Sequence, residues 1–203
     1  MINVNFVYLG LLINLLGGIS YIRDTIIGKI QPNRVSWGLW GLGVMIAFAA
    51  EIKQGVGIQS LATFMVGFTP LLIFFASFLN KKAYWKLTKF DAICGLLSLA
   101  GITLWLITKN ANIAILFSIF ADLMAGVPTL VKSYKFPESE NWVEFASSFI
   151  SVGIAMLTLK QFGFAFIAFP AYIFCYDLAA FVLIKLKFGK IIGNAFKRKN
   201  TVS

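Results

Sequence analysis

An aspartate lies deep inside an apolar stretch of this sequence, where a charged side chain is costly. Asp122 is the tenth residue of the apolar run 113–131. A carboxylate at the centre of a bilayer costs about 2.5–3.5 kcal/mol on insertion scales. Such residues usually face a polar cavity, a partner or a transport pathway. Two interpretations of Asp122 follow: it lines a central substrate site and binds a proton in one state, or it is a buried hydrogen-bonded group that holds helices together.

A second aspartate, Asp177, lies in the last long apolar run, beside Tyr176 and five residues after Tyr172. Two interpretations are open: Asp177 is a proton-relay or gate residue, with Tyr172 in the same pore, or it forms an ion pair with Lys132 or Arg23 near the inner face of the membrane.

A polar stripe is expected on another helix, because Glu144, Ser148 and Ser151 recur at positions i, i+4 and i+7. This spacing places the three side chains on one helical face. The stripe either lines the pore or holds helices together by hydrogen bonds. Gln59 begins a shorter stripe of the same kind.

The elements that carry these residues are predicted to be transmembrane helices. The chain of 203 residues is 59% hydrophobic and only 13% charged, and its mean hydropathy is +0.84. One spanning helix needs roughly 20 apolar residues, and backbone polar groups in hydrocarbon must be satisfied within the segment. The sequence therefore predicts an all-α membrane protein with seven transmembrane helices, at Val4–Ile22, Val35–Ile52, Val56–Leu79, Ala92–Thr108, Ile113–Val131, Trp142–Leu159 and Phe162–Ile184.

The basic residues predict the orientation of these helices. With seven spans, alternate connections carry 15 Lys and Arg residues on one side and 3 on the other. The richer side, which includes Lys132 and the C-terminal tail, is expected to be cytoplasmic, with the N-terminus outside.

Several classes of function are disfavoured by the same residues. The net charge is +10, but the basic residues lie between apolar runs and not along one face of a soluble fold, which argues against nucleic-acid binding. The chain has no histidine, and Cys94 and Cys175 form no CxxC pattern, so neither a metal site nor a cofactor is expected. No phosphate-binding glycine loop and no nucleophile–base pair is evident, and we predict that the protein is not an enzyme.

Two short matches indicate an internal repeat. Asn14–Ile19 aligns with Asp122–Val127 at an offset of 108 residues, and Pro32 with its following tryptophans aligns with Pro137 at an offset of 105. The predicted domain is a single transmembrane unit: residues 1–80 and 111–187 form two parallel three-helix repeats, 81–110 a linker helix, and 188–203 a basic tail. Asn14 is then expected to face Asp122 across a pseudo-twofold axis.

The dipeptide Gln31-Pro32, followed by Ser36-Trp37, resembles a PQ-loop motif. The 3+1+3 arrangement with an external N-terminus is similar to the SWEET (MtN3-saliva) sugar transporters and their PQ-loop relatives. The stretch from Asp24 to Trp37 also resembles a group of bacterial seven-helix membrane proteins. This resemblance implies a location in the bacterial cytoplasmic membrane and a hinge role for the prolines, which are Pro32, Pro128 and Pro137.

The sequence therefore predicts a secondary transporter or facilitator that moves a small polar solute by alternating access, driven by a gradient. Its expected partners are the lipid bilayer and that solute, and the oligomeric state is left open between a monomer and a homo-oligomer. The alternative is a non-transporting receptor or organising protein of the same fold. The substrate site is expected from Asn14, Gln59, Asp122, Glu144, Ser148, Ser151 and Tyr172, with proton coupling at Asp122 and Asp177.

Overall fold

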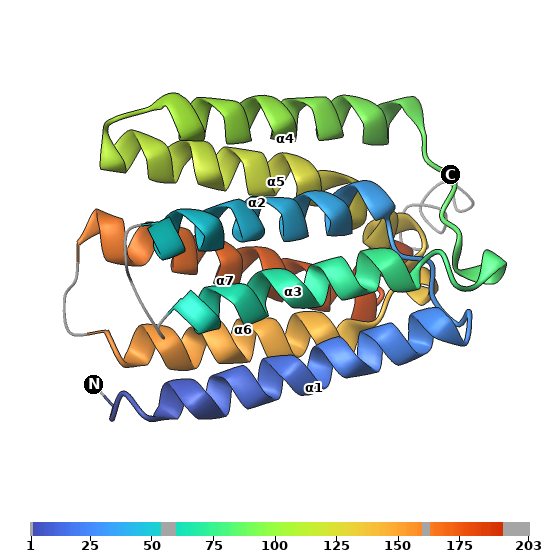
Figure 1. Ribbon diagram of the computed structural model, residues 1–203. Helices are drawn as coiled ribbons and strands as arrows, with labels where there is room; N and C mark the ends of the chain where they lie inside the picture. Colours follow the sequence, from blue (N-terminus) through green and yellow to red (C-terminus); the bar gives the residue numbers. More distant parts are fainter. Residues whose placement is uncertain (1, 54–59, 160–162, 193–203) are drawn as a thin grey trace, which may run out of the picture.

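The computed structural model describes residues 2–53, 60–159 and 163–192, and this part of the chain is helical (Figure 1). Its long α-helices are α1 (Phe6–Ile26), α2 (Arg34–Lys53), α3 (Ser60–Ala76), α4 (Lys89–Ile107), α5 (Ala111–Lys135), α6 (Trp142–Leu157) and α7 (Phe164–Lys185), and residues 188–192 are also helical. Two short 3-10 helices, η2 (Lys81–Ala83) and η3 (Pro137–Ser139), lie in connections. The described residues contain no strand, and the prediction of an all-α protein is confirmed.

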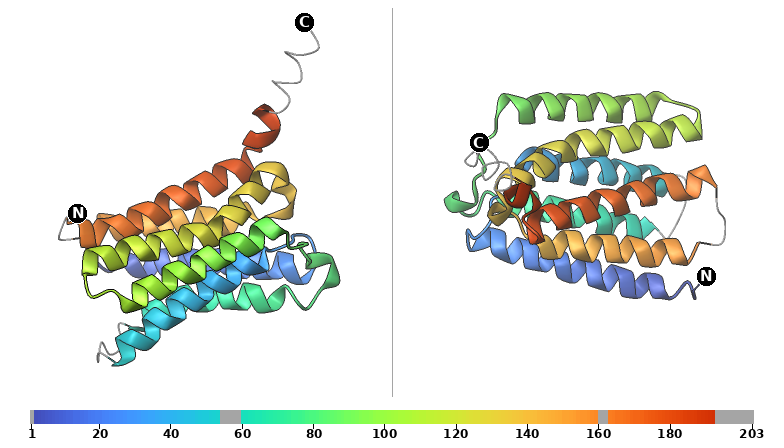
Figure 2. Two further views of the ribbon diagram at one scale, coloured as in Figure 1. Left: turned by 90° about the horizontal axis from the view of Figure 1, so that it is seen from above. Right: turned by 180° about the vertical axis from the view of Figure 1, so that it is seen from behind.

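The helices run side by side along one bundle axis (Figures 1 and 2). The α1–α2, α3–α4 and α5–α6 connections lie at one end, together with the end of α7. We call this the basic end, because lysines such as Lys29, Lys82 and Lys135 lie there. The beginning of α1 and the α4–α5 turn lie at the opposite end.

The order of packing follows a simple pattern. Helix α3 lies against both α1 and α2, and α7 lies against both α5 and α6. Between these two groups, α1 packs on α6 and α2 packs on α5. Helix α4 covers α5 and also contacts α2, at one edge of the bundle (Figure 1).

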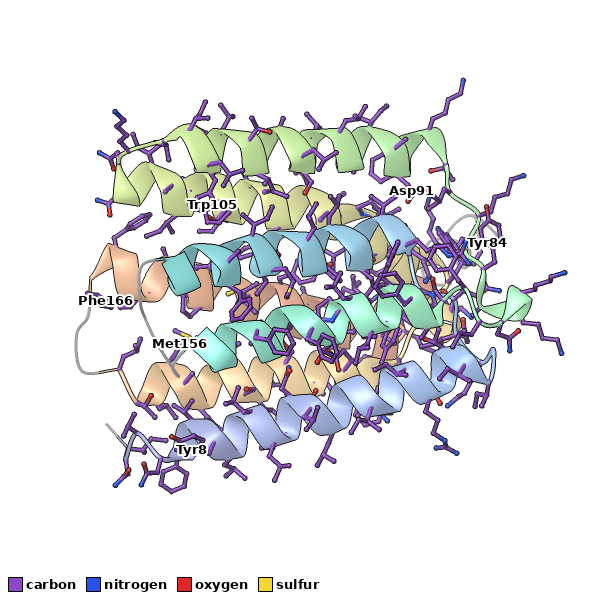
Figure 3. All side chains as sticks on the ribbon, viewed as in Figure 1. Tyr8, Tyr84, Asp91, Trp105, Met156 and Phe166 are labelled. Carbon is purple, nitrogen blue, oxygen red and sulfur yellow. The ribbon has the colours of Figure 1, made fainter. Side chains whose placement is uncertain are left out.

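The distribution of side chains is the reverse of that in a water-soluble protein. Large apolar side chains point outward: Tyr8 and Leu79 are each 73% exposed and Ile107 is 69% exposed. Figure 3 shows Tyr8 pointing away from the bundle on α1. Polar side chains such as Thr25 and Asn33 are fully buried. Lipid as the surrounding solvent accounts for both features, because exposed apolar groups are favourable there and polar groups must find partners inside.

Four helices are long and apolar enough to cross a membrane: Phe6–Ile26, Lys89–Ile107, Asn112–Lys135 and Phe166–Lys185. The described parts of α3 and α6 include shorter apolar helices, Val66–Ala76 and Trp142–Leu157. These helices have the composition of a membrane protein, as the sequence predicted.

The helices begin at polar caps. Thr88 and Asp91 form a capping box at the start of α4, and Asn110 caps α5. Asn33 Oδ1 accepts hydrogen bonds from the first turn of α2, and Asn141 does so for α6. Each cap satisfies backbone N–H groups that have no partner within the helix, so it fixes where the helix starts.

Two helices extend further toward the basic end than predicted. Helix α1 continues to Ile26, past Asp24, and α5 continues to Lys135. Lys132 was expected in a cytoplasmic connection, but it lies in the last turn of α5 and is only 2% exposed. Its burial is possible because partners from two connections meet its ammonium group, as described below.

Prolines occupy two kinds of position. Pro70, Pro128 and Pro170 lie inside α3, α5 and α7, where each removes one backbone hydrogen bond. Pro32 and Pro137 lie in the connections before α2 and α6, and both side chains are fully buried.

Candidate functional site

A cavity of about 510 Å3 lies in the bundle between α2, α4 and α5, with Val66 of α3 and Phe169 of α7 completing its wall. Its lining on α5 runs from Ile115 to Ala125, in the half of the helix nearer the end opposite the basic end. Most of the wall is aliphatic or aromatic. Asp122 is the only charged residue among the described residues that line it.

Asp122 is held in place by two neighbouring helices. The Tyr172 hydroxyl on α7 donates a hydrogen bond of 2.8 Å to Asp122 Oδ2, and Trp40 Nε1 on α2 donates one of 3.2 Å to the backbone oxygen. Within the described residues, no Lys or Arg forms an ion pair with this carboxylate. The structure thus places two of the predicted site residues, Asp122 and Tyr172, in direct contact.

Asn14 does not share this cavity. It lines a second, smaller cavity of about 120 Å3 between α1 and α3, and Val66 contributes to the walls of both. The expected opposition of Asn14 and Asp122 across one site is therefore not seen in this conformation. Gln59, another predicted site residue, lies outside the described residues.

The polar stripe on α6 faces neighbouring helices. Ser148 Oγ donates a hydrogen bond of 2.5 Å to Asp177 Oδ2 on α7. Asp177 thus pairs with a serine, and the ion pair with Lys132 or Arg23 that we considered is not formed. Ser151 packs against Gly10 of α1. The stripe lines neither cavity.

Glu144 is buried where α6 meets α1, and it is only 7% exposed. Its Oε2 atom has no hydrogen-bond partner among the described residues. A Cβ atom on Gly17 would lie 2.9 Å from this oxygen and 1.8 Å from Ser147 Oγ, so only glycine allows α1 to approach α6 this closely.

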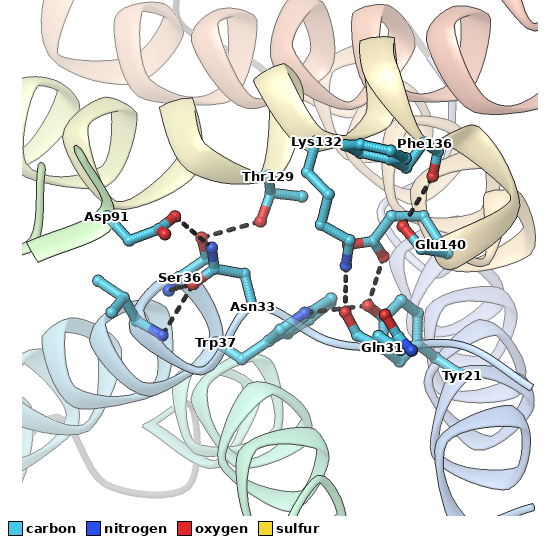
Figure 4. Close-up of polar contacts among 12 residues, drawn as sticks. Tyr21, Gln31, Asn33, Ser36, Trp37, Asp91, Thr129, Lys132, Phe136 and Glu140 are labelled. Carbon is cyan, nitrogen blue, oxygen red and sulfur yellow. Dashed lines mark hydrogen bonds and ion pairs between the residues drawn. The ribbon is translucent and has the colours of Figure 1, made fainter. Parts of the chain in front are cut away.

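The basic end contains a buried network that the sequence did not reveal (Figure 4). Lys132 Nζ lies 2.7 Å from Glu140 Oε1, and the two side chains are 1% and 0% exposed. The same ammonium group donates to the backbone oxygen of Gln31. The Tyr21 hydroxyl donates to Glu140 Oε2 and accepts a hydrogen bond of 3.1 Å from Trp37 Nε1. We call Tyr21, Gln31, Trp37, Lys132 and Glu140 the basic-end network.

Further hydrogen bonds join the same connections. The backbone N–H of Gln31 donates to Ser139 O at 2.9 Å, which ties the α1–α2 connection to the α5–α6 connection. Asn141 Nδ2 donates to Asp24 Oδ2 at 2.9 Å. Asn33 Nδ2 donates to Asp91 Oδ1 at 2.8 Å (Figure 4). The basic end is thereby closed by contacts from α1, α2, α4 and α5 and from two connections.

The cavity and the network are stacked along α5. Ala125 lines the cavity, Thr129 donates a hydrogen bond of 2.8 Å to Ser36 Oγ one turn later, and Lys132 follows in the next turn. The basic-end network therefore lies between the cavity and that end of the bundle.

Charges such as Lys132 and Glu140 look like ordinary connection residues in the sequence, which is why the network was not predicted. The one signal was spacing: a lysine two to three turns after Asp122 on the same helix, followed by a glutamate just before the next apolar run.

No family model matches this chain, and searches of curated proteins and of solved structures returned no significant match. Within the described residues, no group of three or more Asp, Glu, Cys or His side chains is placed to hold a metal ion.

Proposed function

We propose that this protein is a secondary transporter or facilitator that moves a small solute by alternating access. The observation that carries the proposal is the Asp122 cavity, which lies within the bundle while a buried hydrogen-bonded network closes the basic end. A carboxylate inside a membrane bundle typically marks a substrate or ion pathway. In this conformation the solute would enter from the opposite end.

The packing of the helices supports two similar three-helix units as the moving parts. In each unit the third helix lies against both others: α3 against α1 and α2, and α7 against α5 and α6. The contacts of α1 with α6 and of α2 with α5 are equivalent under a twofold relation of the units. We propose that these two contacts are where the units rock, with α4 as the linker.

The helix caps support the same repeat. Asn33 and Asn141 are 108 residues apart, which equals the offset between Asn14 and Asp122. For the second helix of each unit, this cap offset differs from the offset of 105 residues between Pro32 and Pro137. A topology of seven spans with the N-terminus outside, similar to that of PQ-loop and SWEET proteins, is part of the proposal, and the distribution of basic residues supports it.

Opening toward the basic end requires the basic-end network to separate. Lys132 on α5 and Gln31 in the α1–α2 connection belong to different units, and so do Tyr21 and Glu140. Rocking of the units would therefore break these two contacts together. The Lys132–Glu140 pair lies within one unit and would stay intact, so neither charge would be left without its partner.

The test is counterflow of labelled solutes into proteoliposomes, with a panel of organic cations, sugars, amino acids and nucleosides. The Asp122→Asn variant keeps an acceptor for Tyr172 but removes the charge, and its flux should fall by about tenfold or more if the carboxylate contacts the solute. Glu138→Gln is the matched control, because Glu138 is half-exposed in η3 and is not among the residues that line the cavity. Unchanged saturable flux in Asp122→Asn would contradict the assignment of the site.

The same proteoliposomes also distinguish a transporter from the alternative, a receptor that binds a solute without moving it. Saturable binding of a solute without counterflow, from protein shown to be folded, would support a receptor over a transporter.

A further inference from the structure

The cavity has the electrostatic character of a cation site. Among the described residues that form its wall, Asp122 is the only charged one, and none is a Lys or Arg. An anionic solute would be buried beside a carboxylate with no positive partner, which is strongly unfavourable. A cationic solute would supply the positive counter-charge that no described Lys or Arg provides to Asp122.

The aromatic lining points the same way. Trp40, Trp105 and Phe169 contribute to the cavity, and the face of a tryptophan attracts ammonium groups. The Trp40 ring is fixed by its hydrogen bond to the backbone oxygen of Asp122 and by edge-on packing against Trp37 and Tyr176. A rigid indole beside a carboxylate is the kind of surface that binds quaternary and primary ammonium groups.

The remaining polar groups are too few for a highly hydroxylated solute. Besides Asp122 and the indole N–H groups of Trp40 and Trp105, the polar side chains among the described wall residues are Ser98 and Ser118. Ser118 Oγ already donates to the backbone oxygen of Ala114 at 2.9 Å. Most hydroxyl groups of a sugar would find no partner there, and the carboxylate of a zwitterionic amino acid would have no cation to meet.

We infer that the solute of this cavity is a small organic cation, an ammonium group carried on an aliphatic or aromatic body. The ammonium group would lie between Asp122 and the tryptophan faces, and the apolar body would fill the remaining wall formed by α2, α4 and α5. A volume of about 510 Å3 is within the range of pockets that bind small organic molecules. Movement of this cation across the membrane rests on the proposed function, whereas its binding in the cavity does not.

The experiment uses the whole protein in detergent and in proteoliposomes. The probes are benzyltrimethylammonium, phenethylammonium and tetraethylammonium, with glucose, glutamate and uridine as probes of the other classes. Binding is read from thermal stability and from quenching of tryptophan fluorescence, which do not require transport. A ligand present at about 100 times its Kd stabilises the folded state enough to raise the unfolding temperature measurably.

We expect at least one of the three cations to bind, and Asp122→Asn to weaken that binding about tenfold or more. Trp105→Leu should weaken it by a smaller factor, because it removes a ring face but no charge. Trp142→Leu is the matched control: Trp142 lies outside the cavity, on α6, and its substitution should leave binding unchanged.

The failures of the two proposals are distinguishable. Binding of a cation without counterflow would overturn transport and support the cation site. Counterflow of a sugar or another non-cationic probe, with no binding of any of the three cations, would overturn the cation site and support transport. Absence of cation binding in folded protein, with no flux of any probe, would overturn the cation site as well.

Discussion

Asp122 and Lys132 are ten residues apart on α5, about 15 Å along the helix axis. Lys132 is fully enclosed, with Glu140 at 2.7 Å and a backbone oxygen as a second partner. Asp122 lines a cavity, and among the described residues its carboxylate accepts a hydrogen bond from the Tyr172 hydroxyl. One charge is satisfied within the protein, whereas the other is exposed to a space that something else can fill.

This difference suggests that two parts of α5 have different roles: the part around Lys132 stabilises the fold, and the part around Asp122 binds a ligand. Where an ion pair and hydrogen bonds fill the interior, the helices are held in one arrangement and substitution should cost stability. Where the interior is hollow and the charge has no ionic partner, substitution should cost binding instead. The following predictions test this division, from the largest expected effect to the smallest.

Lys132→Met leaves Glu140 as a buried charge without its ionic partner. Breaking a buried pair in this way costs about 3–5 kcal/mol, and we expect a loss of that order in the free energy of unfolding. The measurement is unfolding in mixed micelles with increasing SDS. Lys135→Met, at the exposed end of α5, should differ little from the wild type.

The double variant Lys132→Met/Glu140→Gln sharpens the same prediction. Removing both charges should restore most of the stability lost in Lys132→Met, because no unpaired charge is left. A double variant that is as unstable as the sum of the single variants would show that the two residues act independently.

Gly126→Ala tests the packed region between the cavity and the basic-end network. A Cβ atom there would lie 2.6 Å from the Tyr176 ring, whose hydroxyl donates to Gly126 O at 2.9 Å. Overpacking of this kind costs about 1–3 kcal/mol. The matched control is Gly43→Ala in the cavity wall, where a Cβ would meet no atom within 4 Å. Equal effects of the two substitutions would contradict the contrast between a packed and a hollow interior.

Asp122→Asn should leave the free energy of unfolding within about 1 kcal/mol of the wild type, because an amide oxygen still accepts from Tyr172. The same SDS titration measures it beside Lys132→Met. A large loss of stability would show that Asp122 holds helices together, which is the alternative interpretation drawn from the sequence.

The smallest effect is expected at Glu138, outside the membrane-spanning segments. A hydrogen bond from Lys190 lowers the pKa of Glu138 to about 2. A lowered pKa contributes stability above pH 4.5 that is lost as the pH falls toward 2. Because both side chains are half-exposed, Glu138→Gln should cost less than about 1 kcal/mol at neutral pH, and less still at high salt. Parallel stability curves from pH 3 to 7 for wild type and variant would contradict this.

Much of the fold was predictable because a long apolar run in the sequence predicts a membrane-spanning helix. The predicted segment 35–52 corresponds to α2 at Arg34–Lys53, and 113–131 corresponds to most of α5. The helix ends at the basic end were predicted less well. Buried polar side chains such as Asp24 and Lys132 extend the helices there, and a hydropathy pattern treats such residues as exposed.

Two residues of the candidate site, Asp122 and Tyr172, were predictable, but their surroundings were not. Asp122 was recognisable because an isolated carboxylate in an apolar run is costly and usually marks a functional site. Its contact with Tyr172 and the position of the cavity beside α4 depend on how α5 and α7 are rotated about their axes. No periodicity specifies that rotation, and the expected partner Asn14 lies in a different cavity for the same reason.

The buried ion pair of Lys132 with Glu140 also bears on how the chain is assembled. The two residues are only eight positions apart, in α5 and directly after η3. A pair this close in sequence can form within the second half of the chain alone. Tyr21 and Gln31 lie 119 and 101 residues before their partners Glu140 and Lys132, so their contacts join the first half of the chain to a pair that is local to the second half.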